Sequence, residues 1–197
     1  MMLITFLLLI CASFLAADDA FVYRNDCKYR IIFNNLEIPS IIDLVSVGFG
    51  NGFDWQERII IKGKVFDNPD QFEINLAGDG VIHETANIQL HFNPRFHSPE
   101  VVRNTWRKDV GWGNEVNYGS FPFNNGEAFI LEFIAMRKDM MHISVNGKFY
   151  GYFNSFDLNK ISQIYVSGID TFQINSLTLC PNDYKVEKPA STTTRNY

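Results

Sequence analysis

Three polar side chains with complementary hydrogen-bonding groups occupy alternate positions of one short stretch, residues 88–96 (IQLHFNPRF). Alternate side chains of a β-strand point to opposite faces, so His91, Asn93 and Arg95 would share one face and the apolar residues between them the other. A solvated strand face usually carries Lys, Glu, Thr and Ser. An imidazole, a carboxamide and a guanidinium in register instead form a compact set of donors and acceptors. This set suits a ligand that is rich in hydroxyl groups.

A second group of candidate residues follows downstream, where Asn104, Trp112 and Glu115 add an amide, a large aromatic ring and a carboxylate. An exposed tryptophan offers a flat apolar surface to the C–H face of a pyranose ring. Glu115 would be able to hold Arg95 in place while it accepts a sugar hydroxyl. Taken singly, Trp112 is better explained as a core residue and Glu115 as a surface carboxylate. Taken with the first group, they indicate a site that combines stacking with hydrogen bonding.

Strands must position these residues, and strand patterns dominate the chain between its two ends. Apolar residues repeat with period two in about ten short runs, which Gly, Asn, Asp or Pro separate. Residues 58–65 alternate as a half-buried antiparallel strand does, and Asn146-Gly147 supplies the positive φ angles of a tight hairpin. The sequence therefore predicts an all-β fold, a sandwich of two antiparallel sheets with many Phe rings between them.

The motifs resemble those of the galectins, a family of β-galactoside-binding lectins. Hallmarks of that family are His-Phe-Asn-Pro-Arg-Phe, then Val-x-Asn, then Trp-Gly-x-Glu, and this chain has them in the same order at 91–96, 102–104 and 112–115. The resemblance extends from about Ile32 to Leu179. It includes Ile38-Pro39, Phe121-Pro122-Phe123 and the VNGKF segment at 145–149.

The resemblance implies a jelly-roll-like sandwich that binds galactose on a concave sheet face, without calcium or another cofactor and without catalysis. Carried over residue by residue, His91, Asn93 and Arg95 would bond the axial 4-hydroxyl that distinguishes galactose from glucose, and Arg95 would also reach the ring oxygen. Asn104 and Glu115 would bond the 6-hydroxyl.

The resemblance also implies that Trp112 stacks on the galactose ring and that Glu115 and Arg95 meet a hydroxyl of the next sugar. One departure concerns this second-sugar subsite, because the family commonly has an Arg two residues after the Glu and this chain has Asn117. Asn is shorter and neutral, and the loss of a charge-assisted hydrogen bond typically removes on the order of 1–2 kcal/mol. We expect galactose recognition to be kept and affinity for a disaccharide to be lower.

The two ends of the chain differ from its middle. Residues 1–17 are an apolar run, too short to span a bilayer comfortably, that ends in Ala16-Ala17. We interpret this run as a signal peptide, which predicts a secreted, extracellular protein with no membrane insertion after cleavage. A buried N-terminal strand or an uncleaved anchor is the alternative. Residues 18–180 would form one galectin-type carbohydrate-recognition domain, and the polar residues 181–197 a disordered tail.

Three cysteines bear on the compartment and on the stability of the fold. Cys11 would leave with the signal peptide, and Cys27 and Cys180 would remain near opposite ends of the domain. An even pair in an oxidising compartment favours a disulfide. Two free thiols or a bond between chains are the alternatives.

Charge and residue inventory argue against several classes of protein. The formal net charge is -5 and the basic residues are scattered, so we do not expect a nucleic-acid partner. A glycosidase needs two carboxyl groups that flank the scissile bond; only Glu115 lies clearly in the site, and nothing gives nearby Asp109 a paired geometry. The His residues at 83, 91, 97 and 142 lack metal-ligand spacing. We expect neither an enzyme nor a metal site nor a cofactor.

The expected partners are β-galactoside glycans on glycoproteins or glycolipids. The second interpretation is an interaction protein that keeps the fold but has altered or lost galactoside binding, and Asn117 supports it. Only one copy of the motif is present, so crosslinking of glycans would require self-association, with a homodimer as the candidate assembly.

Overall fold

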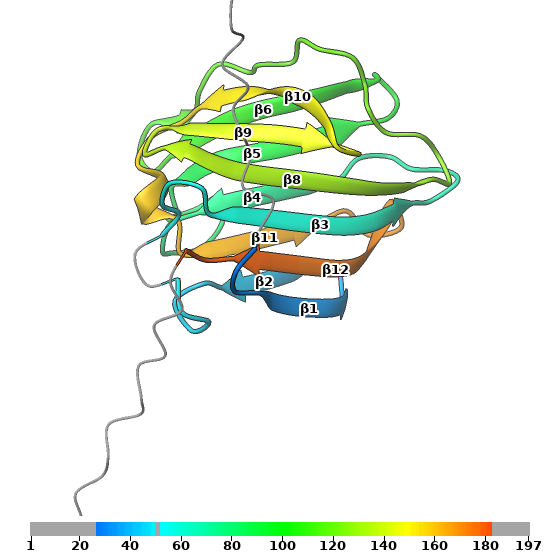
Figure 1. Ribbon diagram of the computed structural model, residues 1–197. Coiled ribbons are helices and arrows are strands. Elements are labelled where there is room, and N and C mark those ends of the chain that lie inside the picture. The colour runs from blue at the N-terminus through cyan, green and yellow to red at the C-terminus, as the bar shows by residue number, and fades with distance from the viewer. Residues whose placement is uncertain (1–26, 50–51, 183–197) are drawn as a thin grey trace, which may run out of the picture.

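Period-two alternation of apolar side chains builds two six-stranded sheets. The computed structural model describes residues 27–49 and 52–182, and every strand pair in this part of the chain is antiparallel. The front sheet has the order β1 (Ile31–Leu36), β12 (Phe172–Cys180), β3 (Arg58–Val65), β8 (Ala128–Arg137), β9 (Met140–Val145), β10 (Lys148–Asn154) (Figure 1). The back sheet has the order β2 (Ser40–Asp43), β11 (Gln163–Ser167), β4 (Glu73–Ala77), β5 (Ile88–Arg95), β6 (Glu100–Arg107), β7 (Gly111–Trp112). The predicted all-β sandwich is confirmed.

Phenylalanine rings fill the space between the sheets. Phe92 on β5 meets Phe133 on β8 edge to face across the gap, with ring centroids 5.4 Å apart. Phe72 stacks on Phe172 of β12 at 4.2 Å. All four rings are buried, and an aromatic side chain removes on the order of 150–250 Å² from water, so these contacts fix how the back sheet sits on the front sheet.

Tight turns join the strands, and regular helix is almost absent. Asn146 and Gly147 have φ angles of 53° and 73° and connect β9 to β10, as predicted from the Asn-Gly pair. The Asn146 side-chain oxygen also accepts a hydrogen bond from the Ile130 amide, which ties this hairpin to β8. The single helix in the described ranges is the 3-10 turn Leu158–Lys160. No helix there has the length and hydropathy that a membrane span requires.

A disulfide between Cys27 and Cys180 closes the described part of the chain. It confirms the pairing within one chain. Asn182 donates a side-chain hydrogen bond to the Trp55 carbonyl at 2.6 Å, so the first residues assigned to the tail are held against the domain. The predicted signal peptide (1–17) and the rest of the predicted tail (183–197) lie outside the described residues and stay predictions.

Removal of the disulfide should lower the stability of the sandwich without changing its fold. The bond joins residues 153 positions apart, and the chain-entropy relation assigns a loop of that length about 4–5 kcal/mol. We expect urea unfolding of the Cys27→Ser/Cys180→Ser variant to show a loss of several kcal/mol. Reductant should destabilise the wild type to the same level and leave the variant unchanged. Equal stability of the oxidised wild type and the variant would contradict a stabilising bond.

Candidate functional site

The outward face of β5 forms part of a hollow on the back sheet. Leu90 and Phe92 point into the core, whereas His91, Asn93 and Arg95 line a hollow of about 440 Å³ that continues over β4 and the loop before β12. The structure therefore brings the three predicted polar side chains together on one strand face. His91 and Asn93 are buried although they face away from the core, because neighbouring side chains surround them at the floor of the hollow.

His91 occupies the centre of a polar row that crosses three strands, with Asn75 of β4 on one side and Asn104 of β6 on the other. Its Nδ1 lies 2.6 Å from the Asn75 Oδ1, an acceptor, so Nδ1 carries the hydrogen. Burial lowers the pKa of His91 to about 4, with His83 and Arg95 acting in the same direction. The Glu73 carboxylate, 3.4 Å from Nδ1, favours the charged ring but is outweighed. His91 is therefore neutral near pH 7, and its Nε2 has a lone pair to offer a ligand.

The Arg95 guanidinium is fixed by three partners. Its Nε donates to the Asn93 Oδ1 at 2.9 Å, and its two terminal nitrogens lie 3.3 Å from a Glu100 oxygen and 3.1 Å from a Glu115 oxygen. Asn93 is itself anchored by a 2.7 Å bond from its Nδ2 to the Phe72 carbonyl. Such charge-assisted pairs hold a planar guanidinium in one orientation, so its remaining N–H groups are preorganised for a ligand.

Asn104 and Trp112 lie on β6 and β7, on the other side of β5 and outside the lining of the hollow. The Asn104 amide donates to the Gly113 carbonyl at 3.1 Å and accepts from the Thr105 amide at 2.8 Å, which leaves one side-chain N–H available. A Cβ at Gly113 would lie 3.1 Å from the Asn104 oxygen, so this close approach favours glycine. Trp112 on β7 is 46% exposed, and its ring centroid lies 4.7 Å from that of His91. An exposed indole thus stands beside the polar row.

Asn117 is linked to the Arg95 guanidinium through Glu100. Its Nδ2 donates to Glu100 at 2.9 Å through the carboxylate oxygen that Arg95 does not use. Sequence reasoning placed Asn117 beside a second sugar but missed this link through Glu100.

Sequence reasoning also missed Glu73 and Asn75, whose side chains contact the His91 ring from the neighbouring strand β4. Phe72, Ile74 and Leu76 are buried in the core, and period-two alternation with them places Glu73 and Asn75 on the opposite face. Their pairing with β5 was the missing information. His83 carried no strand pattern, because it lies in a loop with a φ of 64°, and its ring reaches within 5.7 Å of the Trp112 ring.

The assembled groups suit a neutral, hydroxyl-rich ligand. A neutral imidazole, an amide and a guanidinium offer both donors and an acceptor, and the indole offers an apolar plane. Glu100 and Glu115 bind the same guanidinium, and a third nearby carboxylate, Glu73, lies against His91. Within the ranges that the structure describes, no three His, Cys, Asp or Glu side chains converge to hold a metal ion.

Comparison with known proteins gives a family match. Residues 45–178 match the family model described as galactoside-binding lectin. The 32 kDa beta-galactoside-binding lectin of Haemonchus contortus is 34% identical over 122 residues, which is 61% of this chain and 41% of that protein. Galectin-4 of Rattus norvegicus is 37% identical over 112 residues, 56% of this chain and 33% of that protein. The chain thus spans about two fifths or less of the length of these curated relatives.

A solved structure shares the architecture. The crystal structure of Caenorhabditis elegans galectin LEC-6 superposes with a TM-score of 0.63 at 25% sequence identity, and covers 75% of this chain and 94% of that chain. The similarity therefore extends over nearly the whole of the solved domain.

The buried His91 should make the fold sensitive to acid. Its pKa is about 4 in the folded protein and about 6.5 when unfolded, so the unfolded state binds more protons between these values. The contribution of His91 is fully present above pH 6.5 and is lost as the pH falls toward 4, by on the order of 3 kcal/mol. We expect NMR titration to place this ring below pKa 5. His91→Asn should flatten the slope of stability against pH in that window; an unchanged slope would contradict the assignment.

Proposed function

Because the chain belongs to the galactoside-binding lectin family, we propose that it is a secreted lectin that binds β-galactoside glycans without a metal ion. Members of this family are non-catalytic lectins, in agreement with the prediction that the chain is not an enzyme. Secretion rests on the apolar run at 1–17 and accords with the Cys27–Cys180 disulfide, since such bonds persist in oxidising compartments.

The preorganised β5 face is the observation that carries this proposal. A sugar hydroxyl donates one hydrogen bond and accepts others, and an axial 4-hydroxyl would meet the Nε2 lone pair of His91 and the N–H groups of Arg95. Because Glu100 and Glu115 already hold Arg95, little side-chain freedom is lost when the ligand binds. An epimer with an equatorial 4-hydroxyl would leave these groups unpaired, which penalises glucose.

Trp112 and Asn104 complete the proposed galactose subsite. The exposed indole would cover the C–H face of the ring, and the spare Asn104 N–H with Glu115 would take the 6-hydroxyl. The cation of this subsite, Arg95, is paired with two carboxylates of the protein itself.

Asn117 bears on the second-sugar subsite of the proposed lectin and not on its galactose subsite. Its amide is engaged with Glu100 and adds no positive charge at the second-sugar subsite. A neutral subsite there would bind galactose-terminated glycans less tightly than a charged one. It would leave the galactose subsite unchanged.

Replacement of Arg95 should abolish lectin activity. Arg95→Ala removes charge-assisted hydrogen bonds of roughly 1.5–3 kcal/mol each, so we expect lactose affinity by calorimetry to fall on the order of 100-fold, with loss of retention on a lactose column. Arg137→Ala is the matched control, because Arg137 lies on the front sheet and pairs with Asp139. A folded Arg95→Ala protein that still binds lactose at wild-type affinity would disprove the assignment of the site. A wild-type protein that binds neither lactose nor galactose would disprove the proposed function.

Insertion of a charge at position 117 should strengthen the second-sugar subsite selectively. We expect Asn117→Arg to tighten lactose binding about 5- to 10-fold, equivalent to roughly 1–1.4 kcal/mol, and to leave methyl β-galactoside affinity unchanged. Asn117→Ala separates the gain of charge from the loss of the Glu100 contact. An equal change for both ligands would show that position 117 acts on the galactose subsite instead.

A further inference from the structure

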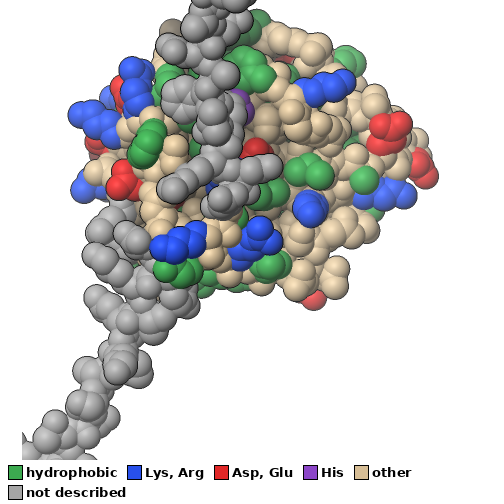
Figure 2. Space-filling view, in the orientation of Figure 1, with side chains coloured by type: hydrophobic (Ala, Val, Ile, Leu, Met, Phe, Trp, Pro, Cys, Tyr) green, Lys and Arg blue, Asp and Glu red, His purple; other side chains and the backbone are tan. Residues whose placement is uncertain are grey.

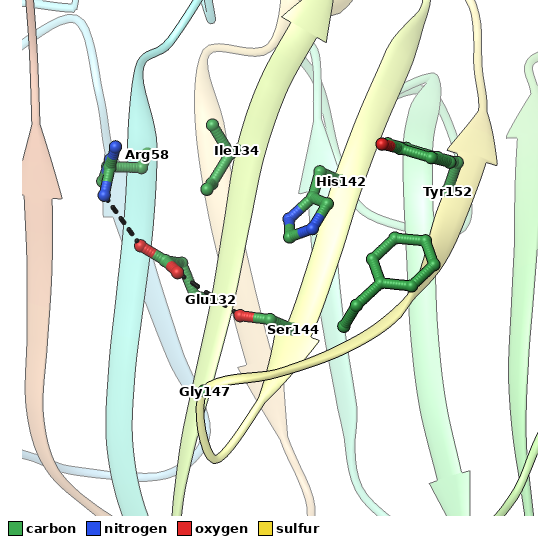
Figure 3. Close-up of a pocket in the computed structure, with 8 residues that line it drawn as sticks. Arg58, Glu132, Ile134, His142, Ser144, Gly147 and Tyr152 are labelled. Atoms are coloured by element: carbon green, nitrogen blue, oxygen red, sulfur yellow. Dashed lines mark hydrogen bonds and ion pairs between the residues drawn. The ribbon is translucent and has the colours of Figure 1, made fainter. Parts of the chain in front are cut away.

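A second hollow, of about 570 Å³, lies on the outward face of the front sheet, on the opposite side of the sandwich from β5 (Figure 3). Strand pairing aligns one row of its lining across four strands, and this row runs Arg58, Ile134, His142, Tyr152. A neighbouring row supplies Glu132, Ser144 and Phe149. Figure 2, which views the molecule from this side, shows hydrophobic side chains among Lys and Arg on the same face.

The floor of this front-sheet hollow is polar and charge-balanced. Arg58 pairs with Glu132 at 3.2 Å, and the Ser144 hydroxyl donates to the other Glu132 oxygen at 3.3 Å (Figure 3). Burial, and to a lesser degree Arg58, lowers the pKa of His142, so its ring is neutral near pH 7. A guanidinium, a carboxylate and a neutral imidazole have no net charge. Such a floor matches a neutral ligand with hydroxyl groups better than it matches an anion.

The wall of the front-sheet hollow is aromatic and partly exposed. Phe149 is 59% and Tyr152 46% exposed on the edge strand β10, with their ring centroids 5.0 Å apart. The His142 ring lies 5.1 Å from Phe149 and 5.7 Å from Tyr152, so the aromatic wall meets the polar floor directly. Scattered exposed aromatics are ordinary on protein surfaces, but a pair beside a partly buried ion pair gives a ligand both a stacking plane and hydrogen bonds.

A similar set of side-chain groups therefore occurs on both faces of the sandwich. Each hollow is lined by a buried neutral His and by an Arg that pairs with a Glu, and a half-exposed aromatic ring lies next to that His. In the back-sheet hollow this ring, Trp112, is a neighbour of the lining and not part of it. The two hollows share no lining residue. The lining of the front-sheet hollow includes Gly147 and Phe149 of the VNGKF segment, and none of the residues at 91–96, 102–104 or 112–115.

We propose that the front-sheet hollow is a second saccharide site, which takes the ring of a neutral pyranose against Phe149 and Tyr152 and its hydroxyl groups over Glu132 and Ser144. Since it uses none of the β5 residues, it binds whether or not the β5 face is occupied. Two sites on opposite faces let one domain bridge two glycan chains, which gains avidity without self-association.

The test uses the full chain with the β5 face disabled. ¹⁵N-labelled Arg95→Ala protein is titrated with lactose, cellobiose and α-1,2-mannobiose, neutral disaccharides that present galactose, glucose and mannose. We expect at least one of them to shift the amide signals of Glu132, Ser144, Phe149 and Tyr152 in a saturable manner. Tyr152→Ala and Phe149→Ala, which alter exposed side chains, should each raise the dissociation constant at least 10-fold.

Ile130→Ala is the matched control, because Ile130 is exposed on the same sheet but does not line the hollow; it should leave the affinity unchanged. Absence of saturable shifts at the hollow with all three sugars would overturn the proposal. So would shifts there that depend on protein concentration and not on sugar, since they would assign the hollow to a second copy of the chain. Lactose binding to the wild type, which tests the β5 face, is a separate measurement.

Discussion

Alternation along β5 couples the site to the core. Leu90 and Phe92 occupy the interior, where Phe92 packs edge to face on Phe133 of the opposite sheet, and this packing fixes the register of the strand. Because side chains alternate along a strand, His91 and Asn93 then face the back-sheet hollow. A slip by one residue would bury the polar set in the core and expose the apolar set. The same apolar contacts that stabilise the sandwich therefore orient the polar side chains toward the back-sheet hollow.

Much of this arrangement was predictable, because it depends on local patterns. Period-two alternation indicated β3 and β5, the Asn146-Gly147 pair indicated the hairpin, and the spacing of polar residues indicated the face on which the site lies. The two cysteines indicated the disulfide once the compartment was assumed. These features are encoded within a few residues of each other or in residue type alone.

The groups that support the site were not predictable, because they come from strands whose pairing the sequence does not state. Asn75 meets His91 only because β4 pairs with β5 in one register, and Glu100 meets Arg95 through the β5–β6 pairing. The link from Asn117 to Glu100 depends on the path of a turn. The front-sheet hollow was missed for the same reason, since Arg58 and His142 join one row only after β3, β8 and β9 have paired.

The charge states and hydrogen bonds of the β5 side chains are fixed by the protein itself, without a ligand. Burial keeps His91 neutral despite the nearby Glu73 carboxylate, and two carboxylates hold the Arg95 guanidinium that a hydroxyl would bond. A site of this kind would distinguish sugars by the positions of their hydroxyl groups and not by their charge.

A crystal structure of the full chain with lactose tests this account most directly. We expect the galactose ring to lie on Trp112 with its 4-hydroxyl within hydrogen-bonding distance of His91 and Arg95. Lactose seated away from β5, or a galactose ring whose 4-hydroxyl points away from these two side chains, would contradict it.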